Sequence, residues 1–403
     1  MRTHITSTNL KHRAIHMSAL RPEIQALRNN GITGIALPRM TDPDVIPLWF
    51  GEGDIPTPDY VREATKKALD EAQVFYSHTR GREEMRVAVK RYLDDLYGLD
   101  LNLDRITIPG STMMAITISA QLACTSGSHA LVVSPAWPNI VSSFAVTGAE
   151  VEHVRQRQVN GRWELHLDDL FAAVRPNTHA MFVNSPCNPT GWVMPAEEQR
   201  RLVEFCRERE ILLIADEVYH RTVFDTDAAP SFLNVMEPDD PVMVISGFSK
   251  AWAMTGWRIG WVVAPAAWEE TWAVMSECFN TGASTFVQFG AMAALEHGEP
   301  FVRDMVKQYA GGRDLVMEIL GDHPRIEMLR PDGAFYAFPR IKGIVDSNRF
   351  AERLADEEKV GLAPGYTFGP GNEEHVRICY ALSHDRLREA LNRIVRFVDR
   401  YED

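Results

Sequence analysis

Lys250 lies in a stretch of small, hydroxylic and aromatic residues that suits chemistry at an amine. The stretch covers residues 246–258 and reads Ser-Gly-Phe-Ser-Lys-Ala-Trp-Ala-Met-Thr-Gly-Trp-Arg. A lysine amine loses its proton more readily when it is removed from water or lies near another cation, and Arg258 follows eight positions later. A neutral amine can attack an aldehyde. The stretch therefore predicts a Schiff-base lysine at position 250, although most lysines are simply solvated at a surface.

Two polar motifs follow apolar runs that are typical of buried strands. An Asn-Pro-Thr-Gly motif at 188–191 follows the run at 180–183, and an Asp-Glu-Val-Tyr motif at 216–219 follows the run at 211–215. In parallel α/β sheets, ligands bind in the crevice beyond the carboxyl ends of the strands. We therefore expect these polar side chains to converge with Lys250 at one edge of a sheet.

The length and patterning of the chain predict the elements that position these residues. A chain of 403 residues exceeds the size at which one core usually stops growing, so two domains are expected. Helical patterns alternate with β-rich runs between about 58 and 285, which predicts an α/β fold with a mainly parallel sheet sandwiched by helices. We expect an N-terminal arm with part of a small domain at 1–57, a large domain at 58–288, and a smaller α+β domain at 289–403.

Individual elements can be predicted from the same patterns. Strands are expected at 130–133, 181–183, 212–214 and 242–245, and a crossover helix at 197–210, where apolar residues recur at helical spacing. In the last part of the chain, helices around 300–320 and 347–359 are expected to flank a strand at 333–338.

Composition excludes several classes of function. A net charge of −13 argues against a nucleic-acid partner, whose phosphates require a basic face. No apolar stretch approaches the roughly 20 residues that span a bilayer, and the polar start of the chain does not resemble a signal peptide, so we expect a cytoplasmic protein with no membrane partner. The five cysteines are scattered without Cys-x-x-Cys spacing, which predicts reduced, buried thiols and no metal site.

Taken in order, Asn-Pro-Thr-Gly, Asp-x-x-Tyr, Ser-Lys and Lys-x7-Arg resemble the fold-type I pyridoxal-phosphate (PLP) enzymes, specifically the class I/II aminotransferases. The resemblance covers nearly the whole chain, from the Leu-Trp-Phe-Gly segment at 48–51 to Arg377. It implies an aspartate-aminotransferase-like fold and PLP as the cofactor. It also implies a ping-pong transfer of an amino group from an L-amino acid to a 2-oxo acid, with Lys250 as anchor and as general acid/base.

Asp216 follows a strand, where a buried carboxylate needs a positive partner such as a protonated pyridine nitrogen. An N-cap of the following segment is the plainer alternative for this residue. The resemblance implies that Asn188 and Tyr219 donate to the ring's phenolate oxygen and that Trp137 stacks on the ring. For Asn188 a turn role is compatible with binding, and Trp137 could equally be a core residue.

The segment after residue 110 predicts an anion site. A strand end is followed there by a helix with hydroxyl residues at its start, and helix N-termini bind anions. The resemblance implies that the phosphate is held by Ser111, Thr112 and Met113, the last through its backbone, with help from Ser249 and Arg258. Simple N-capping is the alternative for one of the two hydroxyl residues.

The remaining assignments also come from the resemblance. Tyr76 matches a tyrosine that reaches the phosphate of the neighbouring subunit, which implies a homodimer with shared active sites. Substrate binding is implied for Gly51, Trp137, Asn188 and Arg377, with Arg377 holding the α-carboxylate in a bidentate contact.

The side-chain pocket is expected near 32–34, 76–80 and 279–282. One hypothesis is that Arg80 and His78 receive an acidic substrate side chain, and the alternative leaves Arg80 solvated or paired at the subunit contact.

Two other functions remain open at this stage. A PLP lyase or synthase of the same fold would share the chemistry up to the carbanion, so the motifs do not separate it from an aminotransferase. A transcription regulator built on this fold would need a basic DNA-binding region, and the N-terminal arm has neither the length nor the charge for one.

Overall fold

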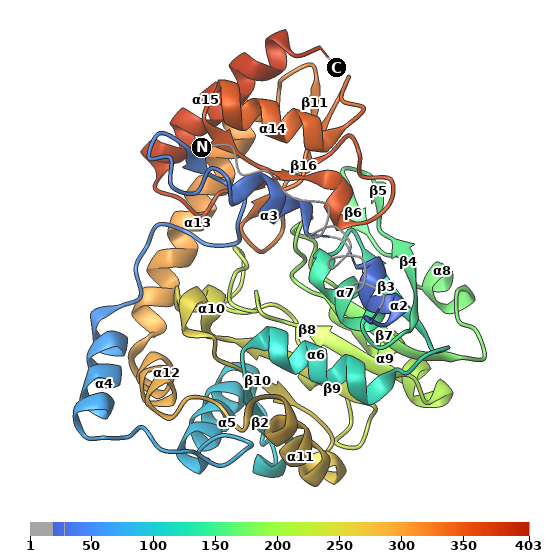
Figure 1. Cartoon of the computed structure of the whole chain (residues 1–403), viewed down its shortest axis with the longest axis vertical. Helices are drawn as coiled ribbons and strands as arrows, with labels where there is room; N and C mark the ends of the chain where they lie inside the picture. Colours follow the sequence, from blue (N-terminus) through green and yellow to red (C-terminus); the bar gives the residue numbers. More distant parts are fainter. Residues whose placement is uncertain (1–18, 28, 403) are drawn as a thin grey trace.

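The computed structural model describes residues 19–27 and 29–402, so the first part of the predicted N-terminal arm lies outside the described residues. Its largest feature is a seven-stranded sheet with the strand order β2-β10-β9-β8-β7-β3-β4 (Figure 1). Only β10 runs against the other strands of this sheet. The strands are β2 (Ile106–Gly110), β3 (His129–Ser134), β4 (Glu150–Arg155), β7 (Thr178–Asn184), β8 (Leu212–Asp216), β9 (Val242–Gly247) and β10 (Gly260–Val263).

Helices bury both faces of this sheet. Successive strand residues point to opposite sides, so each strand contributes to two cores. In β8, Leu213 and Ala215 join a core that also contains side chains of α4, α5, α9 and α12. Leu212 and Ile214 join the opposite core, which is covered by α6, α7 and α11. The helices are α4 (Asp59–Asp70), α5 (Glu83–Tyr97), α6 (Thr112–Ala123), α7 (Pro138–Ala145), α8 (Leu167–Ala172), α9 (Ala196–Arg209), α10 (Phe248–Ala251), α11 (Glu269–Asn280) and α12 (Thr285–His297).

A second, smaller layer combines the C-terminal part of the chain with the N-terminal arm. Strand β1 of the arm pairs in parallel with β14, and β16 is the centre of a three-stranded sheet in the order β12-β16-β15. The elements of this layer are α2 (Pro22–Ala26), α3 (Gly31–Ala36), β1 (Ile46–Pro47), α13 (Glu299–Leu320), β11 (Ile326–Glu327), β12 (Tyr336–Ala337), β13 (Arg340–Ile341), α14 (Ser347–Glu357), β14 (Val360–Gly361), β15 (Ala363–Pro364), β16 (Val376–Cys379) and α15 (His384–Arg400).

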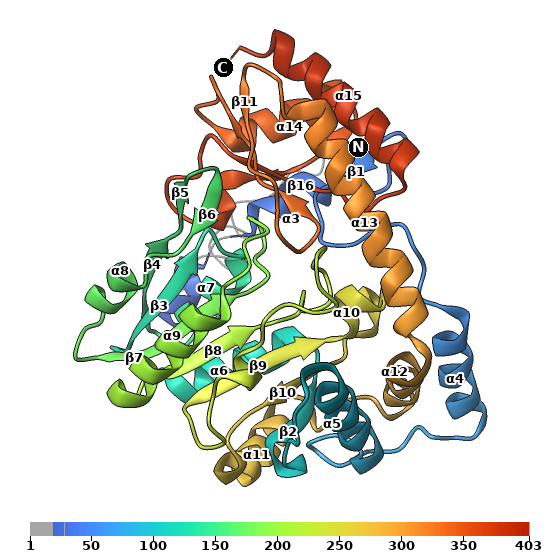
Figure 2. The same ribbon diagram turned by 180° about the vertical axis from the view of Figure 1, so that it is seen from behind.

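Several segments extend between this layer and the large sheet. Helix α13 extends from beside α12 to α15, as seen from behind in Figure 2. The hairpin of β5 (Arg157–Val159) and β6 (Arg162–Glu164) follows the edge strand β4 and rises toward the C-terminal layer.

The predicted fold class is confirmed, since the central sheet is mainly parallel and is covered by helices on both faces. The four strands predicted in the large domain correspond to β3, β7, β8 and β9, and the predicted crossover helix is α9. The strand expected at 333–338 is shorter, because only Tyr336–Ala337 pair with a neighbour. The domain boundaries stay a prediction.

The cysteine prediction needs one correction. Cys124, Cys187, Cys206 and Cys379 are buried free thiols, as expected, whereas Cys278 is exposed. It lies in the amphipathic helix α11, on a side that faces away from the core. Within 19–27 and 29–402, no helix has both the length and the apolar character needed to cross a membrane.

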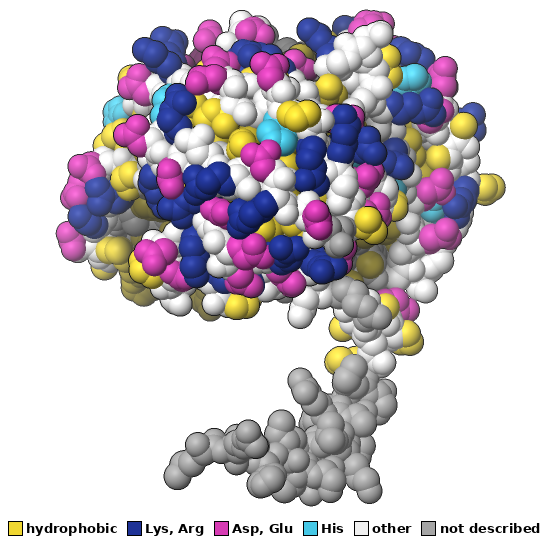
Figure 3. Space-filling model, turned by 90° about the horizontal axis from the view of Figure 1, so that it is seen from above, with side chains coloured by type: hydrophobic (Ala, Val, Ile, Leu, Met, Phe, Trp, Pro, Cys, Tyr) yellow, Lys and Arg dark blue, Asp and Glu magenta, His cyan; other side chains and the backbone are white. Residues whose placement is uncertain are grey.

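Charges of both signs are mixed on the face above α14 and α15 (Figure 3). Ion pairs account for much of this mixture, since Arg396 and Arg400 both contact Glu358, and Arg393 contacts Glu389. This face therefore offers no uniformly basic surface of the kind that binds a phosphate backbone.

Phe350 provides a test of the C-terminal core. Its ring is fully buried and packs edge-on against Phe397 at 5.2 Å and Tyr401 at 4.9 Å between ring centroids. We expect Phe350→Ala to lower the free energy of unfolding by about 3–5 kcal/mol, because a cavity replaces the ring. Glu352→Ala, an exposed change on the same helix, should stay within about 0.5 kcal/mol. Denaturant unfolding followed by circular dichroism measures both, and equal losses would contradict this packing.

Candidate active site

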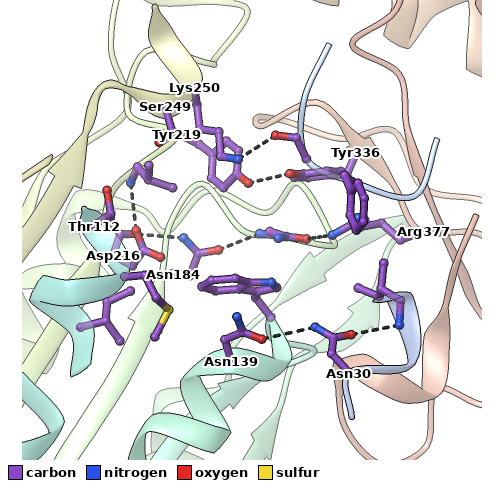
Figure 4. Close-up of a pocket in the computed structure, with 18 of the residues that line it drawn as sticks. Asn30, Thr112, Asn139, Asn184, Asp216, Tyr219, Ser249, Lys250, Tyr336 and Arg377 are labelled. Atoms are coloured by element: carbon purple, nitrogen blue, oxygen red, sulfur yellow. Dashed lines mark hydrogen bonds between the residues drawn. The ribbon is translucent and has the colours of Figure 1, made fainter. Parts of the chain in front are cut away.

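A cavity of about 290 Å³ opens at the carboxyl edge of the large sheet, where strand ends, the N-terminus of α6, the arm and the C-terminal layer meet. Figure 4 shows side chains from all of these segments pointing into it. The residues that line it are Asn30, Ile32, Thr33, Trp49, Phe50, Gly51, Thr112, Met113, Ile116, Trp137, Asn139, Asn184, Asn188, Asp216, Val218, Tyr219, Ser249, Lys250, Arg258, Tyr336 and Arg377.

Lys250 reaches this cavity from the short helix α10, which begins directly after strand β9. Its Nζ donates a hydrogen bond of 2.7 Å to the carbonyl oxygen of Gly51. Burial lowers the pKa of Lys250 to about 8, and the charges of Arg377 and Arg258 lower it in the same direction. Roughly one tenth to one fifth of the amine is therefore neutral near physiological pH, far more than for a lysine in water, and the neutral amine is the state that a nucleophile or general base requires.

Asp216 is the last residue of β8 and pairs in register with Asn184, the last residue of β7. Its Oδ1 accepts a hydrogen bond of 3.1 Å from the backbone N–H of Val218, which closes a turn rather than capping a helix, because no helix begins at 217–220. Burial raises the pKa of Asp216 to about 7, while that hydrogen bond and the charge of Lys250 oppose the rise. A cation placed against this carboxylate would be strongly favoured, because it would compensate a buried charge.

Asn184 holds the two polar motifs together. Its Nδ2 donates to the carbonyl oxygen of Asp216 at 2.9 Å, and its Oδ1 accepts from the backbone N–H of Asn188 at 2.7 Å. One amide side chain thus fixes the loops that follow two adjacent strands.

Tyr219 and Tyr336 share a hydrogen bond of 2.6 Å between their hydroxyl groups (Figure 4). Burial raises the pKa of both phenols, so both stay protonated at neutral pH. Tyr336 leaves no room for a side chain at Gly51, where a Cβ would collide with the Tyr336 hydroxyl. The glycine therefore allows the arm to pass close to both Tyr336 and Lys250.

Arg377 is almost fully buried in β16 and faces the cavity from the C-terminal layer. Its guanidinium donates to Asn188 Oδ1 at 3.0 Å and to the carbonyl oxygen of Trp49, and it lies 4.6 Å from the centroid of the Tyr336 ring. Its Nε has no hydrogen-bond partner within the described part of the chain. A buried guanidinium with an unused donor is suited to a carboxylate ligand.

The N-terminus of α6 forms the end of the cavity that suits an anion. Ser111 is the N-cap, and its Oγ accepts from the backbone N–H of Met114 at 3.1 Å. Thr112 lies close to the sheet, because a Cβ at Gly260 would come within 2.8 Å of its Oγ1. Arg258 is exposed at this end and donates to the carbonyl oxygen of Thr255 at 2.8 Å. Hydroxyl groups, a helix N-terminus and a guanidinium are together suited to a phosphate.

The opposite wall comes from the arm and α7. The Oδ1 of Asn30 caps α3 by accepting from the backbone N–H of Ile32 at 3.0 Å, and its Nδ2 donates to Asn139 Oδ1 at 3.3 Å (Figure 4). Ile32 is buried, and Trp137 precedes α7 as its N-cap. This wall carries no charged side chain within 19–27 and 29–402.

Most of the residues predicted from the sequence line this one cavity, including Lys250, Asp216, Tyr219, Asn188 and Arg377. Two do not. Ser111 serves α6 as its cap and lies outside the lining, so direct phosphate binding by its hydroxyl stays a prediction. Tyr76 is 90% exposed and lies away from the cavity of its own chain.

The hypothesis that Arg80 receives an acidic substrate side chain is wrong for this cavity. Arg80 is 1% exposed, forms an ion pair with Glu269, and donates to Thr107 Oγ1 at 3.1 Å. Its guanidinium also contacts the carbonyl oxygens of Asp104 and Ile106, so it holds the start of β2 in place.

Of the three segments expected to form the side-chain pocket, the first contributes to the cavity of its own chain, and a contribution of the other two to a neighbouring protomer stays a prediction. Ile32 and Thr33 line the cavity, whereas no described residue of 76–80 or 279–282 does.

Sequence reasoning missed several residues of the site. Asn184 ends its strand four residues before the recognised motif, and a polar residue closing an apolar run was the available signal. Tyr336 lies in an aromatic run that predicts a strand, and nothing in that run marks its hydroxyl for the cavity. Asn30 and Asn139 belong to no recognised motif and meet only in the folded chain.

Comparisons with known proteins agree with this geometry. The putative aminotransferase YugH of Bacillus subtilis is 32% identical over 383 residues, which cover 94% of this chain and 98% of that protein. The aromatic-amino-acid aminotransferase 2 of Thermococcus litoralis is 32% identical over 355 residues, which cover 87% of this chain and 90% of that protein. The crystal structure of an aspartate aminotransferase from Thermotoga maritima superposes with a TM-score of 0.87 at 30% identity, covering 94% of this chain and all of the other. Residues 43–394 match the family described as "Aminotransferase class I and II". The chain belongs to this family of aminotransferases.

Proposed function

We propose that this cavity binds PLP and transfers the amino group of an L-amino acid to a 2-oxo acid, with Lys250 as the covalent anchor and the proton carrier. The observation that carries the proposal is a partly buried amine with a pKa of about 8 in the same cavity as a buried carboxylate and a guanidinium with an unused donor. When bound, PLP supplies an aldehyde for condensation with amines and a ring that withdraws electrons from the substrate α-carbon.

The residues present fit this cofactor. Asp216 would face the pyridine nitrogen and keep it protonated, since a cation there compensates the buried carboxylate. Tyr219 and Asn188 carry donors for the ring's phenolate oxygen, and Trp137 offers an aromatic face for stacking. At the other end, Thr112, the backbone of Met113, Ser249 and Arg258 would hold the phosphate, while Ser111 keeps the helix start in shape.

The cavity also fits the substrate. Arg377 would bind the α-carboxylate, with Nε as the donor that is unused in the structure, and Asn188 would hold the guanidinium in orientation. Lys250 would take the proton from the substrate α-carbon and deliver it to the cofactor carbon. Taking the proton requires a neutral amine. The hydrogen bond from Lys250 Nζ to the carbonyl oxygen of Gly51 holds the amine at the edge of the cavity.

We also propose a homodimer in which Tyr76 enters the site of the second protomer. The segment 74–76 is highly exposed although it is apolar, with Phe75 at 79% and Tyr76 at 90%. It is nevertheless held in place, because Thr285 Oγ1 donates to the carbonyl oxygen of Phe75 at 2.6 Å and Ser77 Oγ donates to that of Ala283 at 3.3 Å. An ordered, exposed apolar segment is typical of an interface.

Cytoplasmic residence belongs to the proposal as well, and the five free cysteines support it, because thiols persist in a reducing compartment. The lyase or synthase alternative is not favoured, since the relatives compared above are named as aminotransferases. Their names differ in the amino acid concerned, so membership of the family leaves the donor open.

The pH dependence of cofactor attachment tests the assignment of Lys250. Below its pKa the amine is mostly protonated, so the rate of attachment of PLP to the cofactor-free protein should rise about tenfold per pH unit between pH 6 and 7 and level off above about pH 8. Stopped-flow absorbance measures this rate. A small lysine analogue should instead keep rising toward about pH 10, and a protein profile like that of the analogue would contradict a desolvated amine.

Separate half-reactions test the proposed activity. An L-amino acid alone should transfer its amino group to the protein-bound cofactor with release of a 2-oxo acid, and a second 2-oxo acid should reverse the change. Lys250→Ala should slow this by on the order of 10²–10⁴-fold, because the proton carrier is lost, while Lys307→Ala, at an exposed lysine, should leave it unchanged. Ammonia release without transfer to the cofactor would favour a lyase.

Mixed protomers test the shared site. Lys250→Ala and Tyr76→Ala should each be weakly active alone, whereas a 1:1 mixture refolded together should recover about one quarter of the wild-type activity. Half of the dimers are then mixed, and each of these contains one site with both native residues. Recovery that does not exceed the mean of the two single variants would show that Tyr76 does not act across protomers.

A further inference from the structure

The charged groups of the cavity leave one wall without any charge. Three cations line the cavity among residues 19–27 and 29–402, namely Lys250, Arg258 and Arg377. In the proposed function all three are engaged, by the aldehyde, the phosphate and the α-carboxylate respectively. Asp216, the one carboxylate that the described residues contribute to the lining, is engaged by the ring nitrogen.

The remaining wall is mainly apolar. Its side chains come from the arm, from α3 and α6, and from the start of α7. The polar side chains among them are uncharged. The residues of this wall are Asn30, Ile32, Thr33, Trp49, Phe50, Met113, Ile116, Trp137 and Asn139.

The two amides of this wall are largely satisfied by the protein. Asn30 donates to Asn139 Oδ1 at 3.3 Å and accepts from the backbone N–H of Ile32 at 3.0 Å, and Thr33 Oγ1 donates to the carbonyl oxygen of Asn30 at 2.7 Å. These contacts fix the start of α3 against α7. They also direct the polar atoms of the wall toward one another, so that the wall offers a substrate mostly apolar contact.

A substrate side chain with a carboxylate would lose its water against this wall without gaining a cation from any described residue of the same protomer. Such a loss is strongly unfavourable, because a desolvated charge needs a partner. Arg80 cannot provide one, because it is buried and paired with Glu269. An apolar side chain meets no such penalty and gains from burial against Ile32 and Trp137.

We propose that the amino donor carries an uncharged, mainly apolar side chain, and that Ile32, Thr33 and the Asn30–Asn139 pair form the wall that selects it. The inference rests on the proposed function, because it assumes that Arg258 and Arg377 hold the phosphate and the α-carboxylate.

The test compares donors in the first half-reaction, which needs no acceptor. Under single-turnover conditions, the rate constant divided by the dissociation constant for L-leucine, L-methionine or L-phenylalanine should exceed that for L-aspartate and L-glutamate by on the order of 100-fold. If the acidic donors react equally well or faster, this inference falls while the proposed function stands. If no donor of either class transfers its amino group, both fall.

A charge-insertion variant tests the wall itself. Thr33→Arg places a cation on this wall. The single-turnover rate constant divided by the dissociation constant should then rise about tenfold for L-aspartate relative to L-leucine. Thr226→Arg adds the same charge at an exposed site outside the cavity and should leave the ratio unchanged. An unchanged ratio in Thr33→Arg, with cofactor binding intact, would overturn the assignment of this wall to the substrate side chain.

Discussion

The partial removal of Lys250 and Asp216 from water is the constraint on which the rest of the site depends. Burial moves both groups toward their neutral forms, to a pKa of about 8 for the lysine and about 7 for the aspartate. In water the same two groups would be fully charged and chemically ordinary. The apolar faces of the large sheet supply the folding energy that keeps these two polar groups in place, and a cofactor with complementary charge would remove most of their cost.

The site is joined by hydrogen bonds between parts of the chain that are far apart in sequence. Lys250 and Gly51 are separated by 199 positions, Arg377 and Asn188 by 189, and Tyr219 and Tyr336 by 117. Each pair links the sheet edge to the arm or to the C-terminal layer. A shift of that layer would therefore move the proposed carboxylate-binding arginine relative to the lysine, and the three contacts together fix the spacing on which proton transfer depends.

The charges in the cavity are divided between its ends. Cations occur where the phosphate and the α-carboxylate are proposed to bind, and the wall formed by α3 and α7 has none in the described part of the chain. Arg80 follows the predicted site residue Tyr76 by four positions, but this proximity in sequence does not place it in the cavity. Its buried guanidinium binds the start of β2 instead. A family that shares the cofactor end can thus vary its donor by changing a few residues on one wall.

The sequence by itself determined the elements and the chemical groups at their ends. Apolar runs bounded by polar motifs predicted β3, β7, β8 and β9, and the position of Asp216 and Lys250 after strands predicted that they would meet, because parallel strands share one carboxyl edge. These are local patterns with a fixed geometric consequence. Only the tertiary structure decided which further residues join them, such as Tyr336, Asn30 and Asn139, and which do not, such as Arg80. Those contacts depend on how separate layers pack, and neither hydrophobic period nor motif spacing records the packing of one layer against another.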